Sequence, residues 1–296
     1  MLGLGGSDHD FAAALVCNDD VRVAIEQERL SRRKHGLSLW YESPLQRSID
    51  YCTEAEGISL ADIQSTVSAD TLPARVRYML RNQNLREFTH HLCHAASAYM
   101  MLPAGATAGV IVYDGFGSIS GQSDDGLRNL RETFSFFRFG PEGFECIGQT
   151  VGLAYIERDD FPITVTNSAG LLYELVTGIL GYDIMDAGKT MGLAAHGCPR
   201  YLAALEQFVS YGDEPSACFG CALDDPLFAS TLEEIVAAGG GGFSVKADLA
   251  ASAQEIFNRA LLNCERFFYG CPKGCEASSP LDRGQHGYSR SQSSRG

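Results

Sequence analysis

The sequence predicts an α/β fold in which one strand–turn–strand pattern occurs twice. Near the start, apolar segments at 2–6 and 11–17 flank a turn rich in glycine and aspartate, and segment 21–26 alternates apolar and polar residues. The apolar run 109–113 also leads into an aspartate–glycine turn, and a further strand is predicted at 131–139. Short apolar runs bounded by turn residues, and strict alternation, are both typical of β-strands. We therefore expect an N-terminal three-strand meander and a second unit of similar design.

Helices and short strands are predicted between and after these two units. Helices are expected where apolar residues recur at intervals of three and four and where caps or glycines mark the ends. Between the units, the expected elements are a helix from Ser43 to about Gly57, a strand at 65–69, a helix at 73–82, a strand at 87–89 and a helix at 89–100. After the second unit, helices are expected at 167–181, 199–211 and 246–269.

Two acidic, glycine-containing turns separated by helices are typical of duplicated actin-like ATPases, the ASKHA or ribonuclease H-like class. In such folds the two turns face each other and hold phosphate or metal between two lobes. Aspartate–glycine turns also occur in ordinary hairpins, so the pattern alone leaves both interpretations open. A chain of 296 residues is long enough for one large domain or for two lobes.

The helix predicted at 89–100 carries the clearest candidate site. His90 and His94 are four residues apart, so on a helix their imidazoles lie on one face with Cβ atoms about 5–6 Å apart. Neutral imidazole is a common ligand of zinc and iron, and two of them supply half of a coordination sphere. An isolated pair is more often a helix cap and a core residue, so the metal interpretation needs further ligands from elsewhere in the chain.

Composition excludes several classes of partner. The net charge is −14 and no long basic stripe is present, so nucleic acid is not expected as a partner. No apolar run approaches the roughly 20 residues of a membrane span, and we expect a cytosolic protein. Hydrophobic content of 45% and charged content of 20% are typical of a folded domain.

The ten cysteines predict reduced thiols rather than a disulfide framework. Cys17, Cys52 and Cys264 lie in apolar segments, where buried free thiols are expected. The cysteine pairs at 218–221 and 271–275 are separated by 49 residues, which does not fit a compact zinc ribbon. We expect these pairs to be structural.

Three segments offer groups that could contact phosphate. The first turn, GGSDHD, has small residues and free backbone N–H groups that allow close approach of a phosphate. Segment 28–36, ERLSRRKHG, is the densest positive cluster of an acidic chain, and a solvated surface and a ligand contact account for it equally well. Lys189 lies between glycines in DAGKTMGLAAHG and is a candidate phosphate or carboxylate contact, without the spacing of a P-loop.

Taken together, these motifs resemble the NodU/CmcH family of O-carbamoyltransferases. The matching segments, in order, are GSDHDFAAAL, ERLSRRKHG, THHLCHAASAY, VIVYDGFGS, NSAGLLYELVTGILGY and AGKTMGLAAHG. The resemblance implies an actin-like domain followed by a YrdC-like domain. It also implies that the YrdC-like part makes carbamoyladenylate from ATP and carbamoyl phosphate, and that the actin-like part passes the carbamoyl group to a hydroxyl of an antibiotic or sugar.

The resemblance also implies roles for individual residues. His90, His94 and Asp114 correspond to ligands of a divalent metal, expected to be iron(II), and Asp114 also faces the carbamoyl donor. Gly115 belongs to the same donor-binding turn. The remaining donor-site residues are Lys34, Gly170 and Lys189, of which Lys34 contacts carbamoyladenylate and Gly170 lets the backbone approach it.

The acceptor site is the least determined part of this scheme. His9 and Asp10 lie in the first turn, where we expect them to orient or deprotonate the acceptor hydroxyl. The expected partners are the hydroxyl acceptor and carbamoyladenylate, and a homodimer is left open. Two alternatives remain at this point. One is an ASKHA ATPase or sugar kinase, which does not need the two histidines, and the other is a fragment that binds nucleotide or donor without turnover.

The end of the chain departs from the family pattern. After Tyr269 the resemblance implies a glycine-rich strand, a late aspartate ligand and the YrdC-like domain, whereas residues 271–296 are rich in Ser, Gly and Arg. This composition predicts a disordered tail after a domain at 1–270. A truncated or shifted reading frame would produce such a sequence, and the chain would then bind metal weakly and make no carbamoyladenylate by itself.

Overall fold

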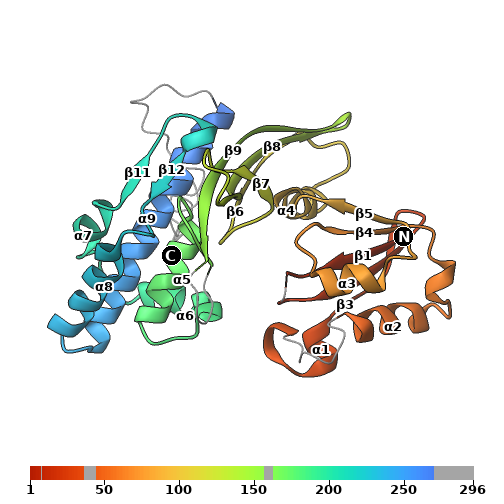
Figure 1. Ribbon diagram of the computed structural model, residues 1–296, viewed down its shortest axis with the longest axis horizontal. Helices are drawn as coiled ribbons and strands as arrows, with labels where there is room; N and C mark the ends of the chain where they lie inside the picture. Colours follow the sequence, from red (N-terminus) through yellow and green to blue (C-terminus); the bar gives the residue numbers. More distant parts are fainter. Residues whose placement is uncertain (8, 37–44, 157–162, 270–296) are drawn as a thin grey trace, which may run out of the picture.

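The chain folds around two β-sheets with a helix between them. The structure is a computed structural model that describes residues 1–7, 9–36, 45–156 and 163–269. Figure 1 shows the first sheet with α1, α2 and α3 at one end of the molecule, and the second sheet with α5 to α9 at the other. The predicted tail at 271–296, Asp8 and the predicted helix start at Ser43 lie outside the described residues.

The first sheet has the strand order β3-β2-β1-β4-β5. Its strands are β1 (Leu2–Gly5), β2 (Ala12–Cys17), β3 (Asp20–Glu26), β4 (Thr66–Ala69) and β5 (Leu85–Phe88). The first three form the predicted antiparallel meander, whereas β4 pairs in parallel with β1 and β5 in parallel with β4. The helices of this half are α1 (Gln27–Ser31), α2 (Gln46–Ala55) and α3 (Ala74–Met79), with short 3-10 turns η1 (Lys34–Gly36) and η2 (Leu60–Asp62).

Alternation along the meander produces the first core. Leu2, Leu4 and Leu15 point to the same face, and all three are buried against Ile49 and Cys52 of α2. Because side chains of a strand alternate between faces, the neighbouring residues of the meander remain more exposed.

The second sheet is antiparallel throughout. Its order is β10-β9-β8-β6, and β7 also pairs with β8. The strands are β6 (Ala108–Tyr113), β7 (Ile119–Gln122), β8 (Asn129–Gly140), β9 (Gly143–Ile156) and β10 (Ile163–Val165). The predicted strand at 131–139 is thus part of the longer β8, which forms a hairpin with β9 that the sequence did not indicate.

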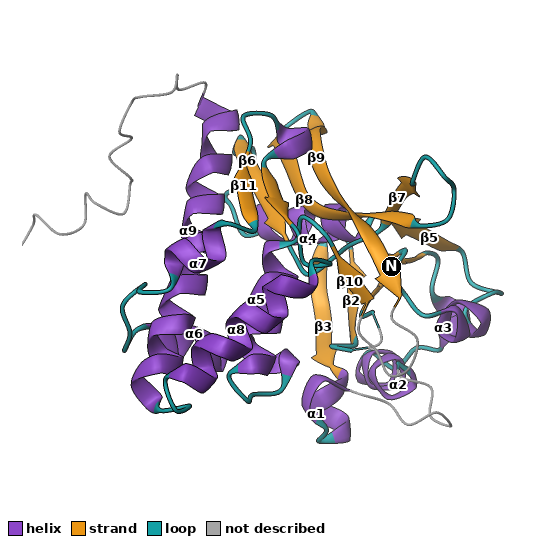
Figure 2. Cartoon of the chain, turned by 60° about the vertical axis from the view of Figure 1, so that its left-hand side comes forward, coloured by secondary structure: helices purple, strands orange, loops and turns teal. Residues whose placement is uncertain are grey.

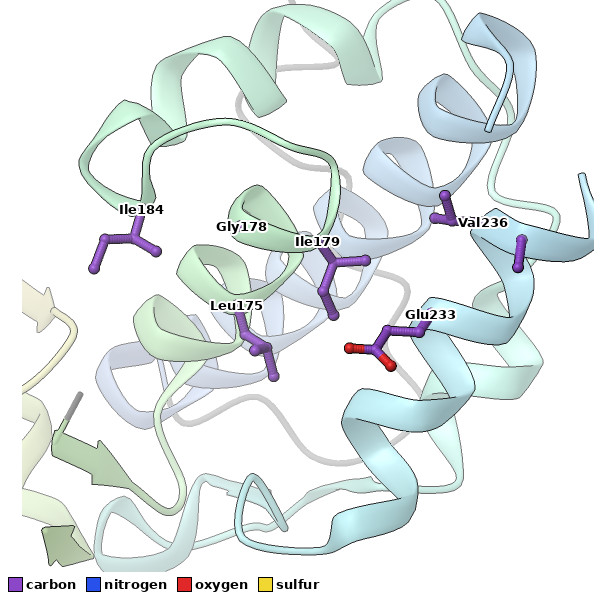
Figure 3. A pocket seen from close by; sticks show the side chains of 7 residues that line it. Leu175, Gly178, Ile179, Ile184, Glu233 and Val236 are labelled. Carbon is purple, nitrogen blue, oxygen red and sulfur yellow. The ribbon is translucent and has the colours of Figure 1, made fainter. Parts of the chain in front are cut away.

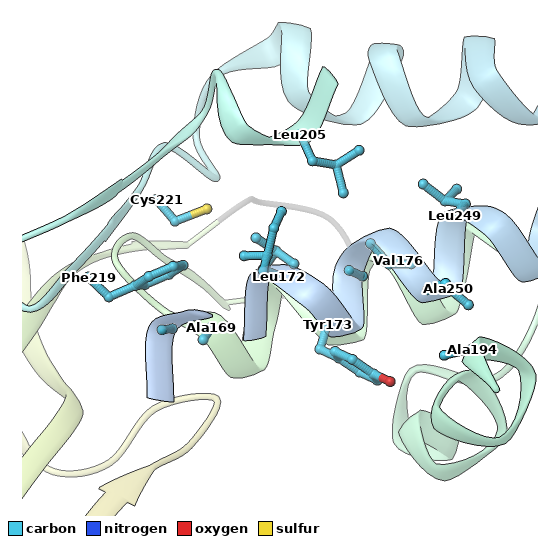
Figure 4. Close-up of a cluster of buried hydrophobic side chains, with 14 of the residues drawn as sticks. Ala169, Leu172, Tyr173, Val176, Ala194, Leu205, Phe219, Cys221, Leu249 and Ala250 are labelled. Carbon is cyan, nitrogen blue, oxygen red and sulfur yellow. The ribbon is translucent and has the colours of Figure 1, made fainter. Parts of the chain in front are cut away.

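Helices cover the second sheet and form the largest core. They are α5 (Ala169–Ile179), α6 (Ala187–Ala194), α7 (Leu202–Glu206), α8 (Pro226–Ala238) and α9 (Phe243–Tyr269), with 3-10 turns η3 (Ile184–Asp186) and η4 (Pro215–Ala217) and a hairpin of β11 (Val209–Tyr211) and β12 (Phe219–Cys221). Figure 2 shows α5, α6, α8 and α9 grouped together. Leu172 and Val176 of α5 pack against Leu249 and Ala250 of α9 at the centre of this core (Figure 4).

Some predicted elements are wrong in extent or type. The helix predicted at 199–211 is only the short α7, followed by β11, because Val209 and Tyr211 favour a strand and pair with β12. The helix predicted at 73–82 is the shorter α3. Helix α8 was missed, although Asp225 caps it and Pro226 occupies its first position, which is a standard start signal.

Burial of the thiols follows the prediction with one exception. Cys52 and Cys264 are free and buried, as expected, and Cys218 and Cys221 are also free and buried. Cys17 is exposed, so its predicted burial is wrong, because it lies at the end of β2 beside the turn into β3.

The described chain is a mixed α/β protein with several sheets, as predicted. Among its described helices, none is both long enough and apolar enough to cross a membrane.

Candidate metal centre

The two histidines lie side by side on α4 (His90–Tyr99), between the two sheets (Figure 1). Alanines and the absence of Gly and Pro favour this helix, and the spacing of four residues places both rings on one face. The Nε2 atoms of His90 and His94 are 3.0 Å apart. The two rings are perpendicular, at 89°, with centroids 4.5 Å apart.

Asp114 completes a three-residue cluster. It directly follows β6, and its Oδ2 lies 2.9 Å from Nε2 of His90 and 3.6 Å from Nε2 of His94. Its Oδ1 accepts the N–H of Gly115 at 2.7 Å. One ligand atom from each of the three residues lies within 4.8 Å of the others, the arrangement expected of residues that could hold a metal ion.

The charges of the cluster favour an ionised carboxylate. Burial alone would raise the pKa of Asp114, but hydrogen bonds with His90 and His94 outweigh it and hold that pKa well below its usual range. The hydrogen bond with Asp114 in turn raises the pKa of His94. His91 is fully buried, and burial lowers its pKa to about 3, so it is neutral; it is not a member of the three-residue cluster.

The three donors fit a divalent metal. With metal–ligand bonds of about 2.1 Å, neighbouring donors of a tetrahedral or octahedral ion lie about 3.0–3.4 Å apart, close to the three separations in this cluster. Nδ1 of His90 lies 3.2 Å from Oγ1 of Thr71. A proton on that nitrogen would leave Nε2 of His90 free as a ligand, which is how metal-binding histidines are usually oriented. Half of the His94 side chain, 55%, is exposed, so the site is accessible.

The start of α5 packs directly on the Asp114–Gly115 turn. Oγ of Ser168, the cap of α5, donates to the carbonyl oxygen of Gly115 at 2.6 Å and accepts the N–H of Leu171 at 3.0 Å. A Cβ on Gly170 would lie 2.6 Å from the backbone of Asp114 and from the nitrogen of Gly115. Gly170 is therefore needed for this close approach of helix to turn, in addition to the predicted approach of a donor, which stays a prediction.

Lys34 and Lys189 converge on one carboxylate. Nζ of Lys34 donates to Asp186, and Nζ of Lys189 donates to the other oxygen of the same carboxylate at 2.6 Å. These hydrogen bonds lower the pKa of Asp186 to about 2, with the larger effect from Lys189, and the bond to Asp186 raises the pKa of Lys34. Lys189 lies on α6 rather than in a loop. Two residues that are far apart in the sequence thus form one cationic cluster.

Comparison with known proteins assigns the chain to a family. Residues 69–216, half of the chain, match the family described as carbamoyltransferase N-terminus. The chain belongs to the carbamoyltransferase N-terminus family. The match contains His90, His94 and Asp114, so the whole three-residue cluster lies within the part that defines membership.

Two curated relatives cover most of this carbamoyltransferase-family chain. Nodulation protein NolNO of Sinorhizobium fredii is 28% identical over 291 residues, which cover 87% of this chain and 38% of the relative. The uncharacterized protein sll1178 of Synechocystis is 26% identical over 248 residues, which cover 68% of this chain and 35% of the relative. The chain therefore spans a little over a third of the length of these relatives.

The first turn of the carbamoyltransferase-family chain holds a second histidine–carboxylate cluster. Nδ1 of His9 lies 2.8 Å from Oδ2 of Asp10, and Nδ1 of His35 lies 3.1 Å from Oδ1 of the same carboxylate. Asp10 and His35 both have positive φ, and the N–H of Asp10 donates to the carbonyl of His35. Within the described residues, no hydrogen bond or ion pair connects this cluster with His90, His94 or Asp114. His35 was missed as a member because its partner is 25 residues away in the sequence.

Two acidic residues close to the metal centre were also missed. Oε1 of Glu174, on α5, would lie 3.1 Å from a Cβ on Gly115. Burial, and then the charge of Asp114, raise the pKa of Glu174 to about 7. Glu132 of β8 is buried beneath the start of α4. A single glutamate in a helix or strand carries no signal of such contacts, because they depend on how distant segments pack.

A pocket of about 420 Å³ lies between α5, η3 and α8. Leu175, Ile179 and Ile184 form its apolar wall, and Glu233 of α8 points into it (Figure 3). None of its lining residues belongs to the metal centre or to the group formed by Lys34, Lys189 and Asp186.

Proposed function

We propose that this chain is the metal-binding part of an O-carbamoyltransferase of secondary metabolism. It would pass a carbamoyl group from carbamoyladenylate, made from ATP and carbamoyl phosphate, to a hydroxyl of a small molecule such as an antibiotic or sugar. Membership of the carbamoyltransferase N-terminus family supports a carbamoyl group as the group that is transferred. The convergence of His90, His94 and Asp114 is the observation that carries the proposal, because it offers a metal site within the matched residues.

Iron(II) is the metal that we propose for this donor set. Two imidazoles and one carboxylate on one side of an ion, with the other positions open, are typical of non-haem iron(II) sites. Bound iron would act as a Lewis acid on the carbonyl oxygen of the carbamoyl group, which is a poor electrophile because its nitrogen donates into the carbonyl. His90, His94 and Asp114 would hold the metal.

The chain's own residues would perform the remaining steps. His9 would donate from Nδ1 to Asp10, which leaves Nε2 as a base for the proton of the acceptor hydroxyl. The acceptor oxygen then forms a bond to the carbamoyl carbon, the bond from that carbon to the adenylate oxygen breaks, and adenosine monophosphate leaves. Lys34 and Lys189 would hold the phosphate of the adenylate, since two ammonium groups already meet at Asp186. Holding both substrates in one place supplies the entropic part of the rate enhancement.

The arrangement of strands supports an actin-like domain as the framework. In the first sheet, the antiparallel meander β1–β2–β3 is followed by the parallel strands β4 and β5. In the second sheet, β6, β8 and β9 form a meander in the same order, again antiparallel. Asp114 follows the first strand of the second meander, as the turn with His9 and Asp10 follows the first strand of the first. We infer a duplicated unit with one acidic turn in each half.

Metal binding by the purified chain is the first test. Under anaerobic conditions, calorimetric titration with iron(II) should show one site in the wild type. Affinity should fall by at least about 100-fold in His94→Ala, which removes an imidazole ligand, and in Asp114→Asn, which removes the charge of the carboxylate ligand. His196→Ala is the matched control, because His196 lies outside the cluster. Equal iron affinity in the wild type and both ligand variants would contradict the proposed site.

Carbamoyl transfer is the second test. The iron-loaded chain receives carbamoyladenylate prepared beforehand and a panel of sugars and aminoglycosides, and mass spectrometry detects carbamoylated products. Product formation that depends on His9 and Asp114 supports the proposal. Donor binding without any product would favour the alternative of a chain that only binds. In a parallel assay with ATP and Mg²⁺, ATP hydrolysis that does not require iron would favour an ATPase or sugar kinase.

A further inference from the structure

Glu132 is a buried carboxylate that lies beneath the metal-binding helix. Its side chain is 1% exposed on β8. Oε2 accepts the N–H groups of His91, at 3.3 Å, and Ser118, at 3.1 Å. Oε1 accepts a hydrogen bond from the side-chain amide of Gln149 at 2.8 Å. Among the described residues, no lysine or arginine forms an ion pair with Glu132, so N–H donors and the positive end of α4 compensate for its charge.

The first turn of α4 depends on distant groups for its hydrogen bonds. Thr89, the N-cap, makes no side-chain bond to the helix. The N–H of His90 donates instead to Oγ of Ser118 at 2.7 Å, and the N–H of His91 donates to Glu132. Oγ of Ser118 in turn donates to Asp70, at the end of β4. Free N–H groups at a helix start need partners, and here the partners come from the second sheet and its loop.

Strand β8, which carries Glu132, also holds the loop that carries Asp114. The N–H of Asp114 donates to the carbonyl of Thr133, and the N–H of Gly117 donates to the carbonyl of Glu132. The N–H of Glu132 donates to the carbonyl of Ser118 at 3.0 Å. Glu132 therefore contacts the helix with its side chain and the Asp114–Ser118 loop with both side chain and backbone.

Packing at this junction leaves little freedom. A Cβ on Gly117 would lie 2.6 Å from Oε2 of Glu132 and 2.7 Å from Cδ2 of His91. Nδ1 of His91 is 2.8 Å from Oγ of Ser135, which also accepts a hydrogen bond from Gln149. Any shift of the Glu132 carboxylate would thus move the loop and the helix relative to each other.

We propose that Glu132 is a positioning residue for the metal centre, which sets the separation between the two histidines on α4 and the carboxylate of Asp114. It does not contact the metal, but it connects the two segments that supply the ligands through the N–H groups of His91 and Ser118. This inference rests on the proposed metal site. Groups that orient ligands in this way typically change metal affinity by about 10–100-fold when they are removed.

Cobalt(II) titration of the full chain tests the proposal, because the visible absorption of cobalt reports the arrangement of its ligands. Glu132→Ala should bind cobalt about 10–100-fold more weakly and with a changed visible spectrum. Glu132→Gln should be intermediate, since its amide nitrogen would face the amide nitrogen of Gln149. The double variant Glu132→Gln with Gln149→Glu restores a donor–acceptor pair and should recover the wild-type affinity and spectrum.

A matched control separates positioning from general loss of stability. Thr177→Val removes a buried hydroxyl that bonds to Thr190 between α5 and α6. It should lower the melting temperature and leave cobalt affinity and spectrum unchanged. If Glu132→Ala binds cobalt as the wild type does, or if its loss of affinity is matched by Thr177→Val, the positioning role is wrong while the metal site stands.

Hydrogen exchange in the metal-free chain gives a readout that does not depend on metal binding. The N–H groups of His91 and Ser118 should exchange about tenfold faster or more in Glu132→Ala, whereas those of α5 should not change. A wild-type chain that binds no cobalt would contradict the proposed metal site, and the exchange rates would still decide whether Glu132 connects the helix and the loop. Unchanged exchange at both N–H groups would overturn the inference.

Discussion

Gly170 touches the backbone of Asp114 so closely that a Cβ at this position would lie 2.6 Å from the carbonyl carbon of Asp114. The contact joins the start of α5 to the turn that carries the carboxylate ligand. Backbone atoms cannot rotate out of the way as a flexible side chain can, so either the helix or the turn must move when a side chain is added.

Gly170→Ala should therefore weaken the metal centre as well as the fold. We expect the free energy of unfolding to fall by about 1–3 kcal/mol, the usual range for an overpacked contact, and iron affinity to fall with it. Gly178→Ala on the same helix is the control, because its Cβ would be 3.5 Å from Ile184, an ordinary contact. Alanine favours helix over glycine by up to about 1 kcal/mol, so this variant should be neutral or more stable. Chemical denaturation and iron titration of both variants check the expectation, and equal behaviour would contradict it.

Thr71→Val removes the group beside Nδ1 of His90. The hydroxyl lies 3.2 Å from that nitrogen, and by accepting its proton it would keep Nε2 of His90 free as a metal ligand. We expect iron affinity to fall by about 10–100-fold. Calorimetric titration measures the change. An unchanged affinity would mean that the ring is oriented by Asp114 alone.

The control for this substitution is Thr66→Val, on β4. The hydroxyl of Thr66 is buried and has no hydrogen-bond partner among the described residues. Replacing it by a methyl group should raise the free energy of unfolding by about 1 kcal/mol, because an unpaired buried hydroxyl is unfavourable. Iron affinity should stay the same, since Thr66 does not contact the metal centre.

Local sequence patterns predicted the elements that are set by hydrophobic alternation and by helix propensity. The meander at the N-terminus follows from alternation, and α4 follows from its alanines, so the pairing of His90 with His94 could be read from their spacing alone. The helix predicted at 199–211 failed because pairing of β11 with β12 outweighed local helix propensity. Strand partners of this kind are not visible in a sequence window.

In the candidate site, too, features set by local sequence could be predicted and features set by distant partners could not. Asp114 was named from its place in a turn and from resemblance, whereas its 2.9 Å approach to His90 depends on how β6 and α4 pack. Glu132 and His35 gave no signal at all, because their partners lie far along the chain. The carboxylate that joins Lys34 to Lys189 was missed for the same reason, although both lysines were named.

The raised pKa of Glu174 predicts that the stability of the fold depends on pH. Burial and the charge of Asp114 raise its pKa from 4.5 to about 7, so the folded state holds a proton that the unfolded state releases. The folded state therefore binds more protons between pH 4.5 and 7, and stability falls as pH rises through this window. Glu174→Gln removes this dependence and should be more stable than the wild type above pH 7 by on the order of 3 kcal/mol.

Denaturation of both forms at acidic and alkaline pH, with a chelator present, measures the effect. Below pH 4.5 the wild type and Glu174→Gln should approach the same stability, because Glu174 is then mostly protonated in both the folded and the unfolded state. A constant difference at all pH values would show that Glu174 is ionised in the folded chain and would contradict the expectation.

Lys34 should matter for ligand binding far more than for stability. Its side chain is 66% exposed, and exposed ion pairs contribute little to stability because solvent and salt screen them. Lys34→Ala should therefore melt close to the wild type but bind adenosine monophosphate about tenfold more weakly, the loss expected for one charged hydrogen bond. Arg138→Ala breaks an exposed ion pair with Glu145 and should leave the affinity for the nucleotide unchanged.

Asp186→Asn is a second test, because it should change the affinity for adenosine monophosphate in the opposite direction to Lys34→Ala. The Asp186 carboxylate accepts hydrogen bonds from both Lys34 and Lys189 and so competes with a bound phosphate. Its removal frees two ammonium groups, and the affinity for adenosine monophosphate should rise. Both changes in affinity should shrink at high ionic strength, since salt screens exposed charges. Calorimetry at low and high salt measures them, and a weaker affinity in Asp186→Asn would show that the carboxylate holds the lysines in place for the phosphate rather than competing with it.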